Sequence, residues 1–312
     1  MIKRALFMTL VVFNICNAQT EINQNQMITP IPDSIPYNKE KAMLGKQLYM
    51  DTTLSADGKV SCNTCHDTKT FGMDNQVFST GINGVMDTPF NSPTTFNAAF
   101  NFVQFWNGRA KDLADQARSP FTNPQEMGLN DEAEVIKIIE QNPDYKAKFN
   151  KIYGEINMDN ITDAIAEFEK TLITPNAPFD RYQKGDENAI SEAAKRGWNA
   201  FKTNGCVACH QGQNIGGTMY QKIGIFEPYP NQENLGRYEI TKVESDKMVF
   251  KVPSLRNVAK TAPYYHDGSI PTLDACVQFM AYYQLGKFLD QQTVEDIVAF
   301  LESLTGEYNE QF

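Results

Sequence analysis

The chain has 312 residues, 41% hydrophobic and 11% aromatic, a length that indicates two domains with real cores. Its 28 basic and 38 acidic side chains give a formal net charge of −10, which argues against a protein built to hold nucleic acid or an anionic membrane face. Six cysteines in so long a chain exclude a small disulfide scaffold.

Residues 1–18 have the pattern of a secretory signal peptide. Lys3 and Arg4 precede a mostly apolar stretch that is too short to span a bilayer, and a small-x-small cleavage site ends at Ala18. A lipid anchor on Cys16 is the alternative, but the residues before it match a lipidation box poorly. We expect cleavage after Ala18 and a periplasmic protein.

Helical patterns dominate the rest of the chain, because apolar residues recur at intervals of three and four. The predicted helices cover residues 39–50, 161–172, 189–202 and 294–304. Residues 81–93, rich in Gly, Asn and Pro, predict a loop. The best candidate for a strand or ribbon is Tyr238 to Val252.

Four of the six cysteines and two of the three histidines fall into two short strings of one pattern. The strings are Cys62-Asn63-Thr64-Cys65-His66 and Cys206-Val207-Ala208-Cys209-His210. One such string arises by chance in about one of a thousand chains of this composition, so two are not accidental. In this pattern two thiols attach a haem c covalently and the histidine is the proximal iron ligand. A zinc site or a redox dithiol is the alternative, and zinc would require the two strings to meet.

The two strings lie 144 residues apart, and a predicted helix precedes each of them. A plausible linker lies between them, from Pro175 to about Gly185. The sequence therefore predicts a mostly α fold with two cytochrome c-like domains, each holding one covalently attached haem c. The expected domains are residues 19–180 and residues 181–312.

Only His266 remains once His66 and His210 are assigned to the two irons. At least one haem must then take a methionine, another side chain, water or nothing as its sixth ligand. Methionine raises the reduction potential of a haem, whereas an open position permits peroxide or oxygen chemistry. The count therefore favours one electron-transfer haem and one reactive haem.

From about residue 37 to the C-terminus, several segments in the same order resemble the bacterial dihaem cytochrome c peroxidases. They are Ser61 to His66, Asn91-Ser-Pro-Thr, Phe96-Asn97, Gln104 to Arg109, Asn123 to Met127, Phe250 to Asn257, Thr261 to Gly268 and Gln284-Leu-Gly286. The methylamine-utilisation maturases belong to the same superfamily.

The resemblance implies which residues hold the two haems. His66 would be proximal to the peroxidatic haem and His210 to the electron-transfer haem. Met280 would be the sixth ligand of the second iron, and Trp106 would be an electron relay between the haems. Both Met280 and Trp106 have an alternative as ordinary core residues. His266 is expected at a haem edge or a domain interface.

The resemblance also implies a peroxide pocket and a calcium site. Gln116 and Glu126 would line the pocket, with Glu126 moving the proton during peroxide cleavage. Each could instead be a solvated surface group. Asn91, with the backbone carbonyls of Thr261 and Pro263, would bind one calcium ion between the domains.

One position departs from the commoner peroxidase pattern. The loop after the first string usually carries Ser-x-Gly-His, and that histidine caps the oxidised iron until reduction releases it. Here the loop reads Ser79-Thr-Gly-Ile-Asn83. Because an amide is a poor iron ligand, we expect the iron at His66 to be open or water-bound without prior reduction.

The reaction implied by the resemblance is the reduction of hydrogen peroxide to water with electrons from a small periplasmic donor. A basic cytochrome c or a cupredoxin would suit the acidic surface. A maturase-like dihaem oxidase that modifies a protein side chain is one alternative, and the Asn83 loop is a point in its favour. A non-catalytic dihaem electron carrier is the other. Many relatives are homodimers.

Overall fold

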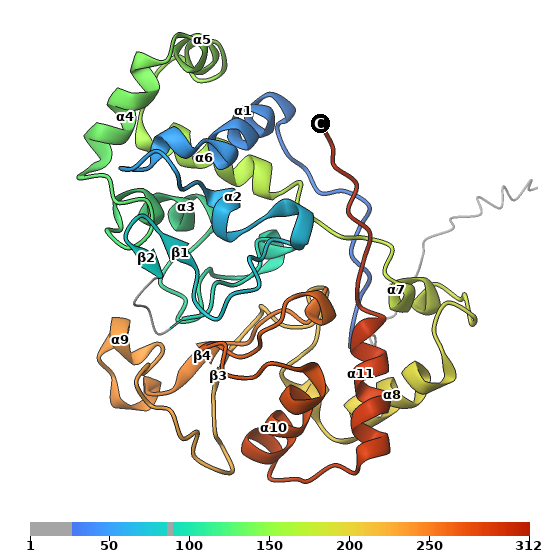
Figure 1. Cartoon of the computed structure of the whole chain (residues 1–312). Coiled ribbons are helices and arrows are strands. Elements are labelled where there is room, and N and C mark those ends of the chain that lie inside the picture. The colour runs from blue at the N-terminus through green and yellow to red at the C-terminus, as the bar shows by residue number, and fades with distance from the viewer. Residues whose placement is uncertain (1–26, 86–89) are drawn as a thin grey trace, which may run out of the picture.

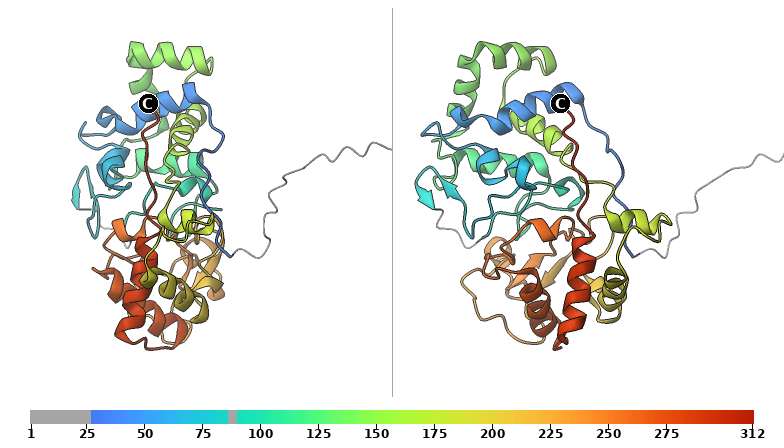
Figure 2. Two further views of the ribbon diagram at one scale, coloured as in Figure 1. Left: turned by 90° about the vertical axis from the view of Figure 1, so that its right-hand side faces the viewer. Right: turned by 45° about the vertical axis from the view of Figure 1, so that its right-hand side comes forward.

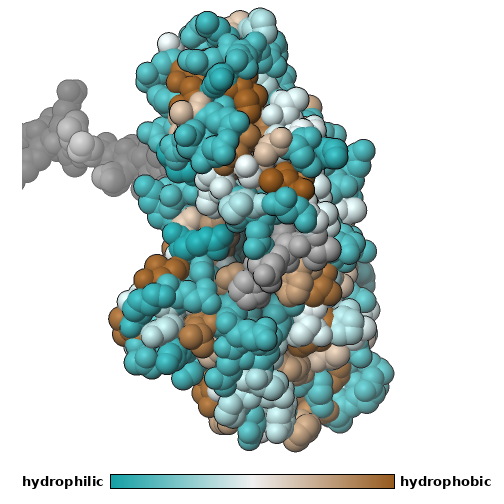
Figure 3. All heavy atoms as spheres, turned by 60° about the vertical axis from the view of Figure 1, so that its left-hand side comes forward, coloured by the Kyte–Doolittle hydropathy of each residue, from teal (hydrophilic) through white to brown (hydrophobic). Residues whose placement is uncertain are grey.

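The computed structural model describes residues 27–85 and 90–312, so the expected signal peptide at 1–18 lies outside the described residues. Within those ranges, no helix combines the length and the hydrophobicity needed to span a membrane. The chain forms two halves stacked one on the other (Figure 1). The face drawn in Figure 3 is mostly hydrophilic, with apolar residues scattered over it.

Helices make up most of the regular secondary structure of the described residues, as predicted. The α-helices are α1 (Lys39–Met50), α2 (Cys62–Cys65), α3 (Leu113–Thr122), α4 (Glu132–Gln141), α5 (Pro143–Ile152), α6 (Met158–Glu169), α7 (Pro178–Gln183), α8 (Glu192–Thr203), α9 (Tyr238–Thr241), α10 (Leu273–Leu285) and α11 (Gln291–Glu302). Two antiparallel ribbons complete the fold. They pair β1 (Thr80–Gly81) with β2 (Gly84–Val85), and β3 (Tyr220–Lys222) with β4 (Val249–Lys251).

The four predicted helices are confirmed, and capping side chains explain where they begin. Helix α1 has the predicted bounds, with the Asn38 side chain accepting a hydrogen bond from the backbone N–H of Lys41. Helices α6 and α11 each begin three residues before the prediction, because Asn157 and Asp290 cap them. The apolar period marks the buried face of a helix, whereas the cap marks its end.

The ribbon predicted from Tyr238 to Val252 is wrong over most of its length. Its first residues form α9, and only Val249–Lys251 is a strand. Lys242 and Met248 adopt the left-handed backbone conformation, which interrupts any continuous strand. The predicted linker likewise contains α7, which begins at Pro178, a residue suited to the first turn of a helix.

Each half is built on one pair of crossed helices that meet at a glycine. In the first half α1 crosses α6, and a Cβ atom placed on Gly45 would lie 1.8 Å from the Ala164 carbonyl oxygen. In the second half α8 crosses α11, and a Cβ atom on Gly197 would lie 1.7 Å from the Asp296 carbonyl oxygen. Only glycine permits backbones to approach so closely. The two halves thus share a structural plan, each with its Cys-x-x-Cys-His string after the first helix of the pair.

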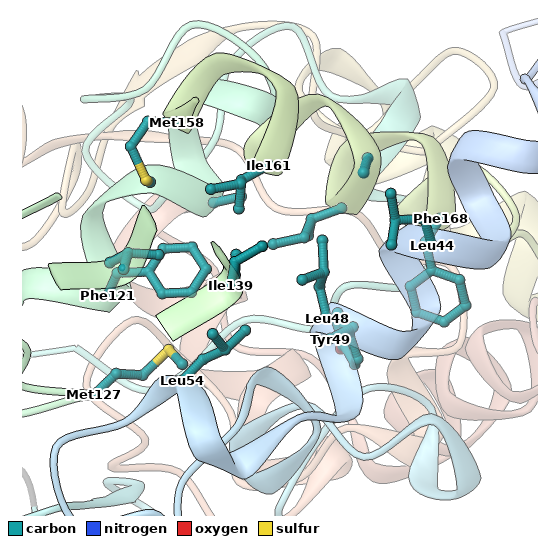
Figure 4. Packing of buried hydrophobic residues seen from close by; sticks show 14 of the residues in the cluster. Leu44, Leu48, Tyr49, Leu54, Phe121, Met127, Ile139, Met158, Ile161 and Phe168 are labelled. Atoms are coloured by element: carbon teal, nitrogen blue, oxygen red, sulfur yellow. The ribbon is translucent and has the colours of Figure 1, made fainter. Parts of the chain in front are cut away.

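Two hydrophobic clusters correspond to the two halves. Figure 4 shows part of the first cluster, in which Leu44 and Leu48 of α1 face Ile161 and Phe168 of α6. The second cluster contains apolar residues of α8, α10, α11 and the β3–β4 ribbon. Cys62 of the first string packs against the first cluster, and Cys206 of the second string packs against the second cluster.

The chain termini cross from one half to the other. Ile28 is fully buried in the second cluster, although the residues that follow it build the first half. Tyr308 and Phe312 pack against the first cluster, and Figure 2 shows the C-terminal segment running from α11 up to α1. Each half is therefore completed by a tail from the far end of the chain.

A buried ion pair fastens the N-terminal segment to the second half. The Arg256 guanidinium lies 2.7 Å from the Asp180 carboxylate, and both side chains are 0% exposed. Arg256 also donates to the backbone carbonyls of Thr29 and Gln213, and Asp180 accepts from the Ile31 backbone N–H. This set of bonds leaves neither charge without a partner.

Candidate functional site

The first Cys-x-x-Cys-His string forms the single turn α2 and ends with His66. The Ser61 hydroxyl and the Thr64 side chain close a capping box over this turn. The Nδ1 atom of His66 lies 3.4 Å from the Gly72 carbonyl oxygen. Burial lowers the pKa of His66, so the ring is neutral with Nδ1 as its donor. In this arrangement Nε2 would be the atom available to bind an iron.

The second string repeats this arrangement in a different local backbone. A 3-10 turn, Cys206–Ala208, takes the place of the α-helical turn. The Nδ1 atom of His210 lies 3.3 Å from the Ile215 carbonyl oxygen, and burial lowers the pKa of His210 to about 4. Both proximal candidates are therefore neutral imidazoles whose ring orientation is set by a backbone carbonyl.

The four cysteines of the strings form no disulfide with one another. Burial raises the pKa of Cys65 and of Cys206 to about 11, so both remain protonated at neutral pH. Among residues 27–85 and 90–312, no three His, Cys, Asp or Glu side chains are arranged to hold a metal ion. In this part of the chain the strings thus do not form the cluster that a zinc site requires.

A cavity of about 240 Å³, here called the His210 cavity, brings the second string together with α10. Cys206, Cys209, His210 and Met280 all line it, although Met280 lies 70 positions after His210 in the sequence. Two thiols, an imidazole and a thioether on one largely apolar cavity are the donor set of a haem c with methionine as sixth ligand. The residues present therefore fit the group.

The Trp106 indole also lines the His210 cavity, and it belongs to the first half of the chain. Its Nε1 donates to the Asn91 carbonyl oxygen at 2.9 Å, and its ring packs against the second hydrophobic cluster. His266 lies edge-on to it, with ring centroids 6.4 Å apart, and stacks on Phe250 at 4.4 Å. Trp106 and His266 thus lie where the two halves meet.

The residues expected to bind calcium all belong to the lining of the same cavity. Asn91, Thr261 and Pro263 all line it. The Asn91 amide nitrogen donates to the carbonyls of Gln76 and Val77 at 2.9 and 3.0 Å, which leaves its Oδ1 as the free acceptor.

Glu126 lies beside the first string, where its charge reaches the Cys65 thiol and the Arg109 guanidinium. Burial raises the pKa of Glu126, and the Asn123 hydrogen bond of 2.6 Å and the Arg109 charge only partly offset this. Arg109 itself is stacked on Phe105, with its guanidinium carbon 3.3 Å from the ring centroid. A carboxyl with a raised pKa beside a cation can both accept and return a proton.

Gln116 occupies a less defined place. It lies on α3 and is half-buried, and its side chain makes no hydrogen bond to the described residues. The structure thus groups Glu126, Arg109 and the first string, while the Gln116 side chain forms no hydrogen bond with that group.

The Asn83 loop is tied to the segment that carries Glu126. Ile82 donates its backbone N–H to the Glu126 carbonyl at 3.1 Å, and the Asn83 amide donates to the Pro124 carbonyl at 2.8 Å. A Cβ atom on Gly81 would lie 1.7 Å from the Gln125 carbonyl oxygen, so glycine is needed there. Asn83 is exposed, and its amide is engaged by the backbone.

Two buried charged residues near the site were missed in the sequence. Glu169 is 3% exposed, and burial raises its pKa to about 8. It falls eight residues after Ile161, on the buried face of α6, and that spacing could have revealed it. Lys251 is 6% exposed and lines the His210 cavity, and no sequence pattern marks it, because alternation in a strand would place it on the face opposite Phe250 and Val252.

Comparison with known proteins identifies relatives along nearly the whole chain. Residues 39–188 match the family model for di-haem cytochrome c peroxidase. The cytochrome c peroxidase Ccp of Escherichia coli is 46% identical over 92% of this chain, which spans only 62% of that protein. The cytochrome c551 peroxidase of Nitrosomonas europaea is 44% identical, and the match covers 91% of this chain and 85% of that one.

A solved structure shares the fold. It is described as a MauG-like protein associated with microbial copper homeostasis, and it matches with a TM-score of 0.76 and 28% identity. The match covers 89% of this chain and 93% of that chain. Together with the two Cys-x-x-Cys-His strings and the repeated helix pair, these matches show that the chain belongs to the di-haem cytochrome c peroxidase family.

Proposed function

We propose that this protein reduces hydrogen peroxide to two molecules of water, consuming two protons and two electrons from a small periplasmic donor. The observation that carries this proposal is the Glu126 carboxyl, which lies beside the first string with a raised pKa and a neighbouring cation. The identities of 46% and 44% to peroxidases over about nine tenths of the chain support it.

The chain's own residues would hold two haem c groups. Cys62, Cys65 and His66 would bind the peroxidatic haem, and the second string with Met280 would bind the electron-transfer haem. When bound, a haem supplies one-electron redox chemistry and, where its sixth position is open, a site for peroxide. Burial lowers the pKa of both proximal histidines and so keeps them neutral for this task, and a backbone carbonyl orients each ring.

Glu126 would manage the proton during cleavage of the O–O bond. It accepts a proton from one peroxide oxygen and returns it to the other, so that water leaves rather than hydroxide. The positive charge of Arg109 would stabilise the negative charge that develops on the departing oxygen. Gln116 would orient the peroxide.

The second half would receive the electrons, and the Trp106 indole would link it to the first. Its Nε1 hydrogen bond to Asn91 fixes the ring at the junction of the halves. A formal charge of −10 favours a basic donor, either a cytochrome c or a cupredoxin. We further propose that the chain has two domains, residues 19–180 and 181–312, and that residues 1–18 direct its export. We also propose that a calcium ion binds at Asn91 and that the protein is a homodimer.

Turnover of the holoprotein with hydrogen peroxide and reduced cytochrome c tests this function. We expect continuous oxidation of two cytochromes for each peroxide consumed. A long-lived oxidised state with negligible turnover would instead favour the maturase-like oxidase. Absence of any reaction with peroxide would identify an electron carrier.

The oxidised protein should contain one open or water-bound haem before any reduction. The reason is Asn83, whose amide is a poor ligand and donates to the Pro124 carbonyl. Electron paramagnetic resonance of the fully oxidised holoprotein should therefore show a high-spin ferric signal. Asn83→His should diminish that signal and make activity depend on prior reduction. Only low-spin signals in the unmodified protein would contradict the expectation.

A further inference from the structure

Lys251 is a buried cation in the wall of the His210 cavity. It lies in β4, is 6% exposed, and is flanked by Phe250 and Val252, which also line the cavity. No hydrogen bond or ion pair joins its ammonium group to the described residues. Burial, with no carboxylate to oppose it, lowers the pKa of Lys251 to about 8.

Arg256 is the other buried cation among residues 27–85 and 90–312, and its surroundings differ. Arg256 is 1% exposed and has a carboxylate partner in Asp180 together with two backbone carbonyls. A buried charge without a partner strongly destabilises a fold. The contrast between Arg256 and Lys251 indicates that the partner of Lys251 comes from a group that enters the cavity.

The neighbours of Lys251 tie it to the second string and to Trp106. Its backbone N–H donates to the Trp106 carbonyl at 2.8 Å. Its strand β4 pairs with β3, and Gln221 of β3 reaches the Cys209 sulfur with its amide nitrogen at 3.5 Å. The β3–β4 ribbon therefore connects the Cys209 sulfur with the part of the cavity lining that contains Lys251.

We propose that Lys251 is the counter-ion for a carboxylate of the haem held at Cys206 and Cys209. A haem is largely apolar, and its two carboxylates are the anionic groups that it would bring into the cavity. The inference rests on the proposed haem attachment and adds a residue that positions and tunes the group. Reduction removes one positive charge from the iron, so a buried cation nearby favours the reduced state and raises the potential.

The test is the reduction potential of each haem in the intact holoprotein after Lys251→Met, which keeps the side-chain length and removes the charge. Spectroelectrochemical titration should show that the equilibrium constant for reducing the His210 haem falls by about tenfold or more. For one electron this corresponds to a reduction potential lower by about 59 mV. The potential of the His66 haem should change far less. Lys251→Arg should restore the wild-type value, because it keeps the charge.

Lys242→Met is the matched control. Lys242 lies at the end of α9, is exposed and is not part of the lining of the His210 cavity. Removing the same charge there should leave both potentials nearly unchanged, because solvent screens it. If Lys251→Met loses haem, Lys251→Gln carries the same test with a side chain that still donates a hydrogen bond.

The haem content separates this inference from the proposed function. Fewer than two covalent haems in the unmodified protein would contradict the proposed function. Two haems with an unshifted potential in Lys251→Met or Lys251→Gln would overturn the assignment of Lys251 and leave the peroxidase proposal intact. A lowered potential that Lys251→Arg restores supports it.

Discussion

Replacing Glu126 with glutamine should lower the turnover of hydrogen peroxide by about 10²- to 10⁴-fold, the usual contribution of a positioned acid–base group. Glutamine fills the same space beside Arg109 and keeps a hydrogen bond with Asn123, but it cannot carry the proton. The measurement is kcat with reduced cytochrome c, made on protein with its full haem content.

The pH dependence provides a second signature of Glu126. The carboxyl must be ionised to accept the first proton, so activity should fall as the pH drops through its pKa. Because burial raises that pKa, this limb lies at a higher pH than for an ordinary glutamate. Glu126→Gln should abolish the limb. Glu140→Gln, on the exposed side of α4, should leave both rate and pH profile unchanged. Full turnover by Glu126→Gln would remove Glu126 from the mechanism.

The second large effect concerns stability. Asp180→Ala should lower the free energy of unfolding by about 3–5 kcal/mol, because it strands the Arg256 charge in the interior. Urea unfolding of the holoprotein, followed by far-UV circular dichroism, measures this loss. Breaking the exposed Lys151–Glu40 pair with Glu40→Ala should cost less than about 1 kcal/mol.

A double variant distinguishes a stranded charge from lost packing. Asp180→Leu combined with Arg256→Met removes both charges and fills similar volume, so it should cost less than Asp180→Ala alone. If the double variant is less stable than Asp180→Ala, the ion pair stabilises the protein mainly by holding the Thr29 segment in place. Neutralising a buried charge would then be the smaller contribution.

Features fixed by neighbouring residues could be predicted from the sequence, and features fixed by distant ones could not. Both strings were evident because each Cys-x-x-Cys-His is a local unit. The start of α6 was misplaced because Asn157, a polar cap, lies outside the apolar period that was used. The strand expected from Tyr238 failed because Lys242 and Met248 take left-handed backbone conformations that side-chain patterns do not reveal.

The candidate site shows the same division. Met280 could be named by resemblance, but only the fold shows that it borders the His210 cavity. Glu126 could be named by resemblance, whereas the influence of the Arg109 charge on its pKa depends on segments folded together in three dimensions. Lys251 escaped notice because lysine is so often exposed.

The exchange of tails between the halves has a consequence for the order of assembly. The first half is synthesised first, yet its cluster is finished only when Tyr308 and Phe312 have been made. The second half in turn needs Ile28, which is synthesised near the start of the chain, long before the other residues of that cluster. Neither half can reach its final packing as an independent early product, so the two must mature together, and a nick in either tail would loosen the half at the opposite end of the chain.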